Sequence, residues 1–157
     1  DPNREFSEAQ EGQMQKFKEA SARYRRLMED EDIQTAYQQI IAERGLESRL
    51  RALVIGDILK APKVSTIDLS NFHGEVGNTI RLIAEDSVGV SRLTLSIFDA
   101  TDNAVTESAE MPMNGKVSGT VEWMYTVTES IVAGHEVEVR VAAYDLAGNV
   151  MEGTKAA

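Results

Sequence analysis

The spacing of apolar residues changes at Pro62, and this change constrains the fold more than any other feature of the chain. Before Pro62, apolar side chains recur every three or four residues, the period of an α-helix; after it they alternate, the period of a β-strand. Charge changes at the same point: residues 1–61 hold 10 basic and 12 acidic residues, and residues 62–157 hold 6 and 14. We therefore predict an N-terminal helical segment, residues 1–61, and a β domain, residues 62–157.

The helical segment is predicted to contain three α-helices. The first runs from about Arg4 to Met28, with one apolar stripe along it formed by Phe17, Ala20, Tyr24 and Leu27. Asp30 is a predicted N-cap for the second helix, and Gly45 is a predicted left-handed C-terminal stop for it. The third helix must end before Pro62, because proline cannot continue it.

These helices are short and their apolar faces are narrow, so they cannot form a sufficient core alone. Phe17, Tyr24 and Leu27 are therefore predicted to contact a partner surface. One solution is packing on the β domain. The other is self-association into a homodimer through Phe6, Phe17 and Tyr24.

The β domain is predicted to hold seven strands separated by turn residues. Alternation is clearest at residues 119–128 and 136–145, where every second side chain is apolar. Seven short strands at this spacing are typical of a two-sheet sandwich. The fold class is thus mainly β, a seven-strand immunoglobulin-like β-sandwich with an N-terminal helical segment, and the expected strands are 63–69, 78–86, 91–100, 104–112, 119–128, 136–145 and 149–155.

Three stretches of the β domain resemble bacterial immunoglobulin-like domains: AEDSVGVSRLTLSIFDATDN, VEWMYTVT and VRVAAYDLAGN. With the preceding helices, the chain also looks like an uncharacterised family of small bacterial proteins that join a helical segment to such a sandwich. The resemblance covers nearly the whole chain. It implies an architecture and no chemistry.

Two loops of the predicted sandwich each carry an aspartate that ends a strand, Asp86 in DSVG and Asp145 in DLAGN. Alternate loops of antiparallel strands lie at the same end, so we expect these carboxylates to be neighbours. Ca²⁺ prefers six to eight oxygen ligands, and short loops with Asp and Asn supply them. Asp86, Asp145 and Asn149 are thus a candidate calcium site. The alternative is that each aspartate only accepts hydrogen bonds from amides of its own turn.

His73 and His135 are expected at the opposite end, in the connections before the second and sixth predicted strands. There they form a candidate two-histidine metal site; the alternative is two solvated surface histidines. Trp123 is in phase with Val121 and Val127, so we expect it in the core rather than on a sugar-binding surface.

The rest of the composition argues against catalysis. The chain has no Cys and only two His, and it contains no nucleophile-elbow or phosphate-binding motif. We therefore expect a non-enzymatic protein-interaction or structural module that needs no cofactor. The alternative function is a calcium-dependent or carbohydrate-binding module that uses the loops around Asp86 and Asp145.

The formal net charge of -10 repels phosphate backbones, so we expect no nucleic-acid partner. The expected partner is a protein, which includes a second copy of this chain. No apolar run approaches the roughly 20 residues of a membrane span, so no membrane insertion is expected. Residues 1–11 show no secretory signal, which favours the cytoplasm as an expectation.

Overall fold

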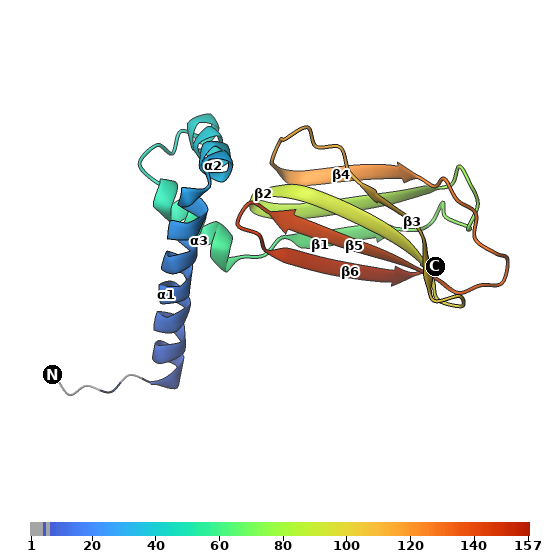
Figure 1. Cartoon of the computed structure of the whole chain (residues 1–157), viewed down its shortest axis with the longest axis horizontal. Coiled ribbons are helices and arrows are strands. Elements are labelled where there is room, and N and C mark those ends of the chain that lie inside the picture. Colours follow the sequence, from blue (N-terminus) through green and yellow to red (C-terminus); the bar gives the residue numbers. More distant parts are fainter. Residues whose placement is uncertain (1–4, 6) are drawn as a thin grey trace. The chain divides into compact units, whose positions relative to one another are not determined.

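The computed structural model describes residue 5 and residues 7–157. The chain separates into two compact units, Asp1–Leu59 and Lys60–Ala157 (Figure 1). The first unit is helical and the second consists of strands. Arg4 and Phe6, to which we assigned a place in the first helix and in its apolar stripe, lie outside the described residues.

The first unit contains the three predicted helices, α1 (Glu8–Glu29), α2 (Glu31–Arg44) and α3 (Leu50–Leu59). α1 begins later than predicted because Ser7 caps it: the Ser7 hydroxyl accepts from the Gln10 amide at 3.2 Å, and the Gln10 side chain accepts from the Ser7 amide at 2.9 Å. Asp30 caps α2 as predicted, accepting from the Asp32 and Ile33 amides. Gly45, at φ 64°, ends α2.

A buried hydrogen bond joins the second and third helices. Tyr37 is fully buried, and its hydroxyl donates to a carboxylate oxygen of Asp57 on α3 at 2.6 Å. α1 contributes the buried Ala20. The other buried apolar residues of the unit lie on α2 and α3; they are Ile40, Ile41, Val54 and Ile58.

Within the described part of the chain, no helix has the length and apolar character that a membrane span requires.

The second unit has six strands, not the seven predicted, in one curled sheet. They are β1 (Lys63–Asp68), β2 (Thr79–Asp99), β3 (Ala104–Glu110), β4 (Ser118–Thr126), β5 (Val137–Asp145) and β6 (Val150–Ala156). The prediction of separate strands 78–86 and 91–100 is wrong, because both belong to β2.

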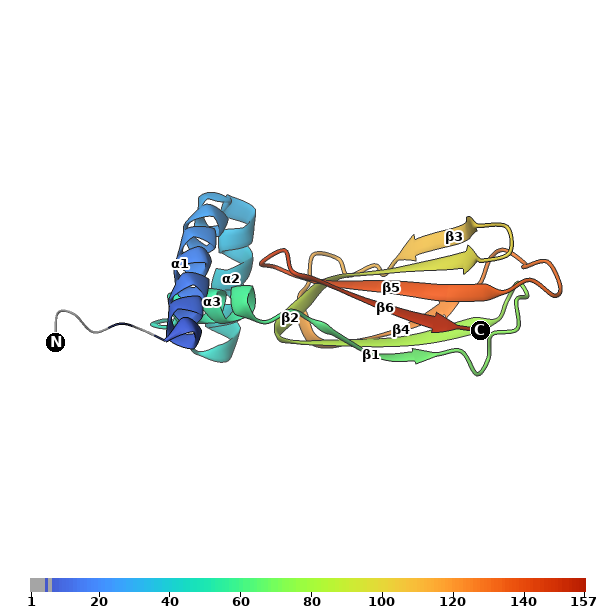
Figure 2. The same ribbon diagram turned by 90° about the horizontal axis from the view of Figure 1, so that it is seen from below.

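The reason lies at residues 86–89, which were predicted to form a reversing turn. One carboxylate oxygen of Asp86 accepts hydrogen bonds from the Val88 amide at 3.1 Å and the Gly89 amide at 2.8 Å. The chain bends here without reversing, since β4 pairs with β2 on both sides of the bend, at Glu85 and at Val90. β2 then passes from one layer of the unit to the other (Figure 2).

Each half of β2 therefore pairs with different strands. Its first half lies between β1 and β4, and its second half lies between β3 and β5, with β6 beyond β5. All of these pairs are antiparallel. The two layers enclose one apolar core, to which alternate residues of β2, β4 and β5 contribute; it includes Ile80, Leu82, Leu93, Leu95, Ile97, Val121, Val139 and Val141.

Contacts between the layers close both sides of the core. On one side, the Lys155 ammonium of β6 donates to the Ile67 carbonyl of β1 at 3.0 Å. On the other, the Tyr125 hydroxyl of β4 donates to Glu107 of β3. Trp123, which we predicted to lie in the core, is partly buried and packs against it, with its ring edge-to-face to Tyr125 at 5.4 Å between centroids.

Candidate functional sites

The connections before β2 and before β5 meet at one end of the β unit, as predicted. Three backbone hydrogen bonds join them: Gly77 amide to Val127 carbonyl at 2.9 Å, Val127 amide to Asn78 carbonyl at 2.8 Å, and Ile131 amide to Gly74 carbonyl at 2.8 Å. Gly74 has φ +80°, and a Cβ at this position would lie 3.3 Å from the Ile131 Cβ. Glycine is therefore required where the two loops touch.

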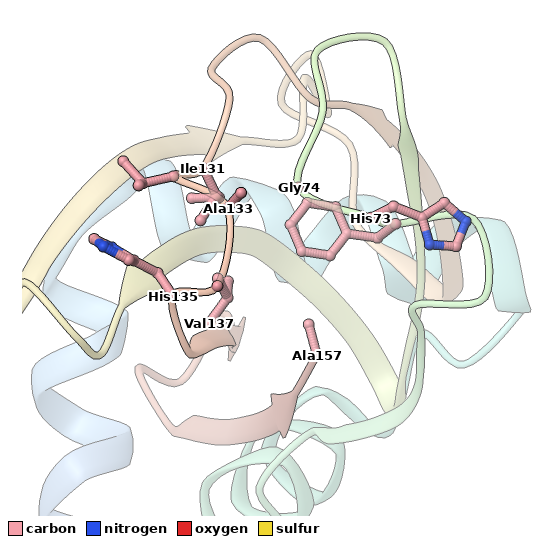
Figure 3. A pocket seen from close by; sticks show the side chains of 10 residues that line it. His73, Gly74, Ile131, Ala133, His135, Val137 and Ala157 are labelled. Carbon is pink, nitrogen blue, oxygen red and sulfur yellow. The ribbon is translucent and has the colours of Figure 1, made fainter.

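These loops border a cavity of about 350 Å³, whose lining includes Phe72, Ile131, Val137 and both histidines (Figure 3). The His73 and His135 side chains point in opposite directions (Figure 3). The two imidazoles therefore do not form the predicted two-histidine metal site.

His135 instead forms an ion pair with an aspartate that the sequence argument missed. Its Nδ1 lies 2.7 Å from Asp99 Oδ2 and 3.7 Å from Asp102 Oδ2. The other Asp99 oxygen accepts from the Thr101 and Asp102 amides, both at 3.0 Å. This interaction fastens the β2–β3 turn to the loop before β5. The only sequence signal for it is an aspartate before a turn, which is common in any β protein.

The ion pair shifts the pKa of both partners. The hydrogen bond from the Asp102 amide, followed by that from His135, lowers the pKa of Asp99 below 3.8. The hydrogen bond to Asp99 raises the pKa of His135 above 6.5. The ion pair with Asp99 thus stabilises the imidazolium form of His135.

Asp86 and Asp145 converge at the bend of β2, as the loop argument predicted. Val90 of β2 pairs with Asp145 at the end of β5, and a carboxylate oxygen of each aspartate lies within 4.8 Å of the other. The residues are 7% and 3% exposed. Asn149 donates its backbone amide to Asp145 Oδ1 at 2.8 Å and its side-chain amide to Oδ2 at 3.0 Å. Asn149 thus orients the Asp145 carboxylate.

The predicted partner-binding residues of α1 divide into two groups. Tyr24 and Leu27 are partly buried, and the Arg51 guanidinium of α3 lies 5.0 Å from the centre of the Tyr24 ring. Phe17 is 52% exposed, and Met14, which the sequence argument did not select, is 54% exposed. A shallow hollow lined by Gln10, Gln13, Met14 and Phe17 covers this side of the helix.

Comparisons with known proteins add little to this geometry. No family model matches the chain, and no curated protein matches it. Among solved structures, the chain is similar to a DUF3244 family protein with an immunoglobulin-like beta-sandwich fold from Bacteroides vulgatus. That match has 11% identity and a TM-score of 0.30, and it covers 61% of this chain and 98% of the other. The strand order described above, not this likeness, supports our description of the fold.

Proposed function

We propose that the chain is a non-enzymatic protein-interaction module, built from an immunoglobulin-like sandwich and a helical unit, and that the N-terminal half of α1 is its binding surface. The observation that carries this proposal is the exposure of that half. Every residue from Glu8 to Glu19 is exposed, including Met14 and Phe17. Leu59 of α3, which is 48% exposed, borders a second hollow beside Phe17. Grouped apolar side chains on a surface are typical of a protein-binding site.

The partner that fits this surface is a second copy of the chain. Glu11, Met14 and Lys18 are spaced three and four residues apart, so they form one row along the helix. If two copies of α1 pair antiparallel with Met14 at the centre, Glu11 of each copy lies opposite Lys18 of the other. One two-fold contact therefore contains two identical ion pairs, which is the symmetry expected of a homodimer.

The expected association is weak. Full burial of a Met or Phe side chain contributes about 1.5 to 3 kcal/mol, so the exposed halves of Met14 and Phe17 in two copies contribute about 3 to 6 kcal/mol. Exposed ion pairs add about 0.2 to 1 kcal/mol each. Association entropy opposes both terms. Since this entropic cost is at least about 4 kcal/mol, we expect a dissociation constant of about 1 mM or weaker.

Exchanging the charges of Glu11 and Lys18 tests the proposal. Association is measured by sedimentation equilibrium at protein concentrations up to the expected dissociation constant. Glu11→Lys alone and Lys18→Glu alone each place like charges opposite each other, and each should weaken association about tenfold. The double variant restores opposite charges and should regain the wild-type constant. Glu47→Lys, an exposed position between α2 and α3, controls for the change in net charge.

Two results would contradict the proposal. One is a wild-type mass that stays at the 17.3 kDa of one chain across the whole range. The other is a double variant that associates no better than either single variant. In that case the charges do not face each other across the contact.

A further inference from the structure

We propose that Asn114 is a site of spontaneous covalent modification, at which the backbone nitrogen of Gly115 displaces the side-chain nitrogen of Asn114 as ammonia. Asn114 and Gly115 form the only Asn-Gly pair of the sequence. They lie in the connection between β3 and β4. This connection belongs to the β unit, so the inference is independent of the interaction surface on α1.

The reaction requires no group beyond the two residues and water. The Gly115 nitrogen forms a bond to Asn114 Cγ while the bond from Cγ to Nδ2 breaks, and the proton of the Gly115 amide leaves with Nδ2 as ammonia. The product is a five-membered succinimide ring. Water then opens the ring at one of its two carbonyls, which gives either aspartate or isoaspartate. Asparagine is one of the thermally labile residues.

The structure leaves the attacking nitrogen and its target accessible. Asn114 and Gly115 have φ values of 55° and 73° and form the centre of a tight turn. Both residues are exposed. A Cβ built at Gly115 would meet nothing within 4 Å, so the space around the turn is open. Because glycine has no Cβ, its nitrogen can approach Asn114 Cγ without a steric clash from its own side chain.

Few interactions hold this turn in one conformation. Among the described residues, none forms a hydrogen bond with the Asn114 side chain or with the Gly115 amide. The pairing of β3 with β2 ends at Glu110, and the pairing of β4 with β2 begins at Ser118. Between them, one hydrogen bond closes the turn, from the Lys116 amide to the Met113 carbonyl at 3.0 Å. Rotation of the backbone toward the attacking geometry therefore breaks little structure.

Asn103 provides a matched comparison within the same chain. It is also exposed and in a turn, between β2 and β3, and its φ of 52° is close to that of Asn114. The residue that follows it is Ala104, whose Cβ crowds the approach of the backbone nitrogen. The two asparagines thus share a backbone conformation and differ in the next residue.

Peptide mapping by mass spectrometry tests the proposal after incubation of the full chain in mildly alkaline buffer at physiological temperature. Each event replaces an NH₂ group by OH and adds one negative charge to the formal -10, so anion exchange separates the product. We expect Asn114 to convert about tenfold faster than Asn103 or more, which corresponds to a difference in barrier of about 1.4 kcal/mol. We also expect isoaspartate among the products, because direct hydrolysis of the side-chain amide gives aspartate alone.

Two substitutions exchange the residue after each asparagine. Gly115→Ala should slow conversion of Asn114 about tenfold, and Ala104→Gly should accelerate conversion of Asn103 by a similar factor. The melting temperature of each variant controls for a loss of folding, and the wild-type comparison of the two asparagines needs no variant.

Three results would overturn the proposal. The first is equal conversion of Asn114 and Asn103 in the wild-type chain. The second is conversion of Asn114 to aspartate without isoaspartate, since the succinimide is then not formed. The third is an unchanged rate at Asn103 in Ala104→Gly, since the following residue then does not control the reaction.

Discussion

Replacing Glu107 by alanine should destabilise the β unit by about 2 to 4 kcal/mol. Glu107 on β3 accepts from the Tyr125 hydroxyl of β4, from the Thr128 amide and hydroxyl, and from the Glu129 amide at 3.2 Å. A hydrogen bond between a partly buried hydroxyl and a charged group contributes about 1.5 to 3 kcal/mol. Water can replace Glu107 at the exposed Thr128 and Glu129, so we assign these donors only about 1 kcal/mol together.

Denaturant unfolding followed by the fluorescence of Trp123 measures this loss, because Trp123 is the only tryptophan of the chain and packs on the core of the β unit. Glu110→Ala is the matched control. Glu110 lies on the same strand and pairs with Arg92 at 2.6 Å, but both side chains are about half exposed, so its loss should cost at most about 1 kcal/mol. Equal losses for Glu107→Ala and Glu110→Ala would refute the argument.

The pH dependence of the Glu107 effect follows from its pKa. Burial alone would raise that pKa, but the hydrogen bonds from Tyr125, Thr128 and Glu129 outweigh burial and bring it below 4.5. A carboxyl whose pKa is lowered by folding stabilises the fold above its unfolded pKa, and this contribution is lost as pH falls through the folded pKa. The difference between wild type and Glu107→Ala should therefore be constant above pH 4.5 and shrink in acid.

Three further results are expected. Because folding raises the pKa of His135 above 6.5, its ion pair with Asp99 stabilises the fold fully below pH 6.5, and this contribution is lost as pH rises through the folded pKa. The difference in unfolding free energy between wild type and His135→Gln, measured by denaturant unfolding, should therefore narrow with rising pH. A difference that widens with rising pH would show that the ion pair does not stabilise protonated His135. Gly89→Ala should destabilise the chain, because its Cβ would lie 2.2 Å from Val117 Cγ1, and Val117→Ala in the same chain should recover part of the melting temperature; no recovery would exclude this clash as the cause. Leu93→Ala should cost about 2 to 5 kcal/mol in the same unfolding assay, since Leu93 is fully buried, and a cost below about 1 kcal/mol would mean that the core is not packed there.

The features predicted well from the sequence are those that local patterns determine. Alternation in β5 placed Val139, Val141 and Ala143 in the core, and the structure buries all three. Asp30 and Gly45 marked the ends of α2 because caps depend on nearby backbone groups alone. The change of period at Pro62 likewise separated helices from strands.

The errors have a common physical cause, which is that residues distant in sequence decide the outcome. DSVG has the composition of a turn, but β4 pairs with β2 on both sides of it, at Glu85 and at Val90, and the strand continues. His135 was paired with His73 on loop placement, whereas its partner is Asp99 in another turn of the same unit. In α1, Phe17, Tyr24 and Leu27 were predicted to contact one partner surface, whereas Arg51 of α3 lies over the Tyr24 ring and Phe17 is exposed.

The most direct test of the central claim, that α1 pairs with a second copy about Met14, is disulfide cross-linking. The chain contains no cysteine, so a single introduced cysteine reports one position. Antiparallel pairing brings the two Met14 positions together and holds the two Glu11 positions about 10 Å apart along the axis, at a rise of about 1.5 Å per residue. Mild oxidation should therefore convert Met14→Cys to a covalent dimer and leave Glu11→Cys monomeric. Equal cross-linking of the two variants, or no cross-linking of Met14→Cys, would contradict the claim.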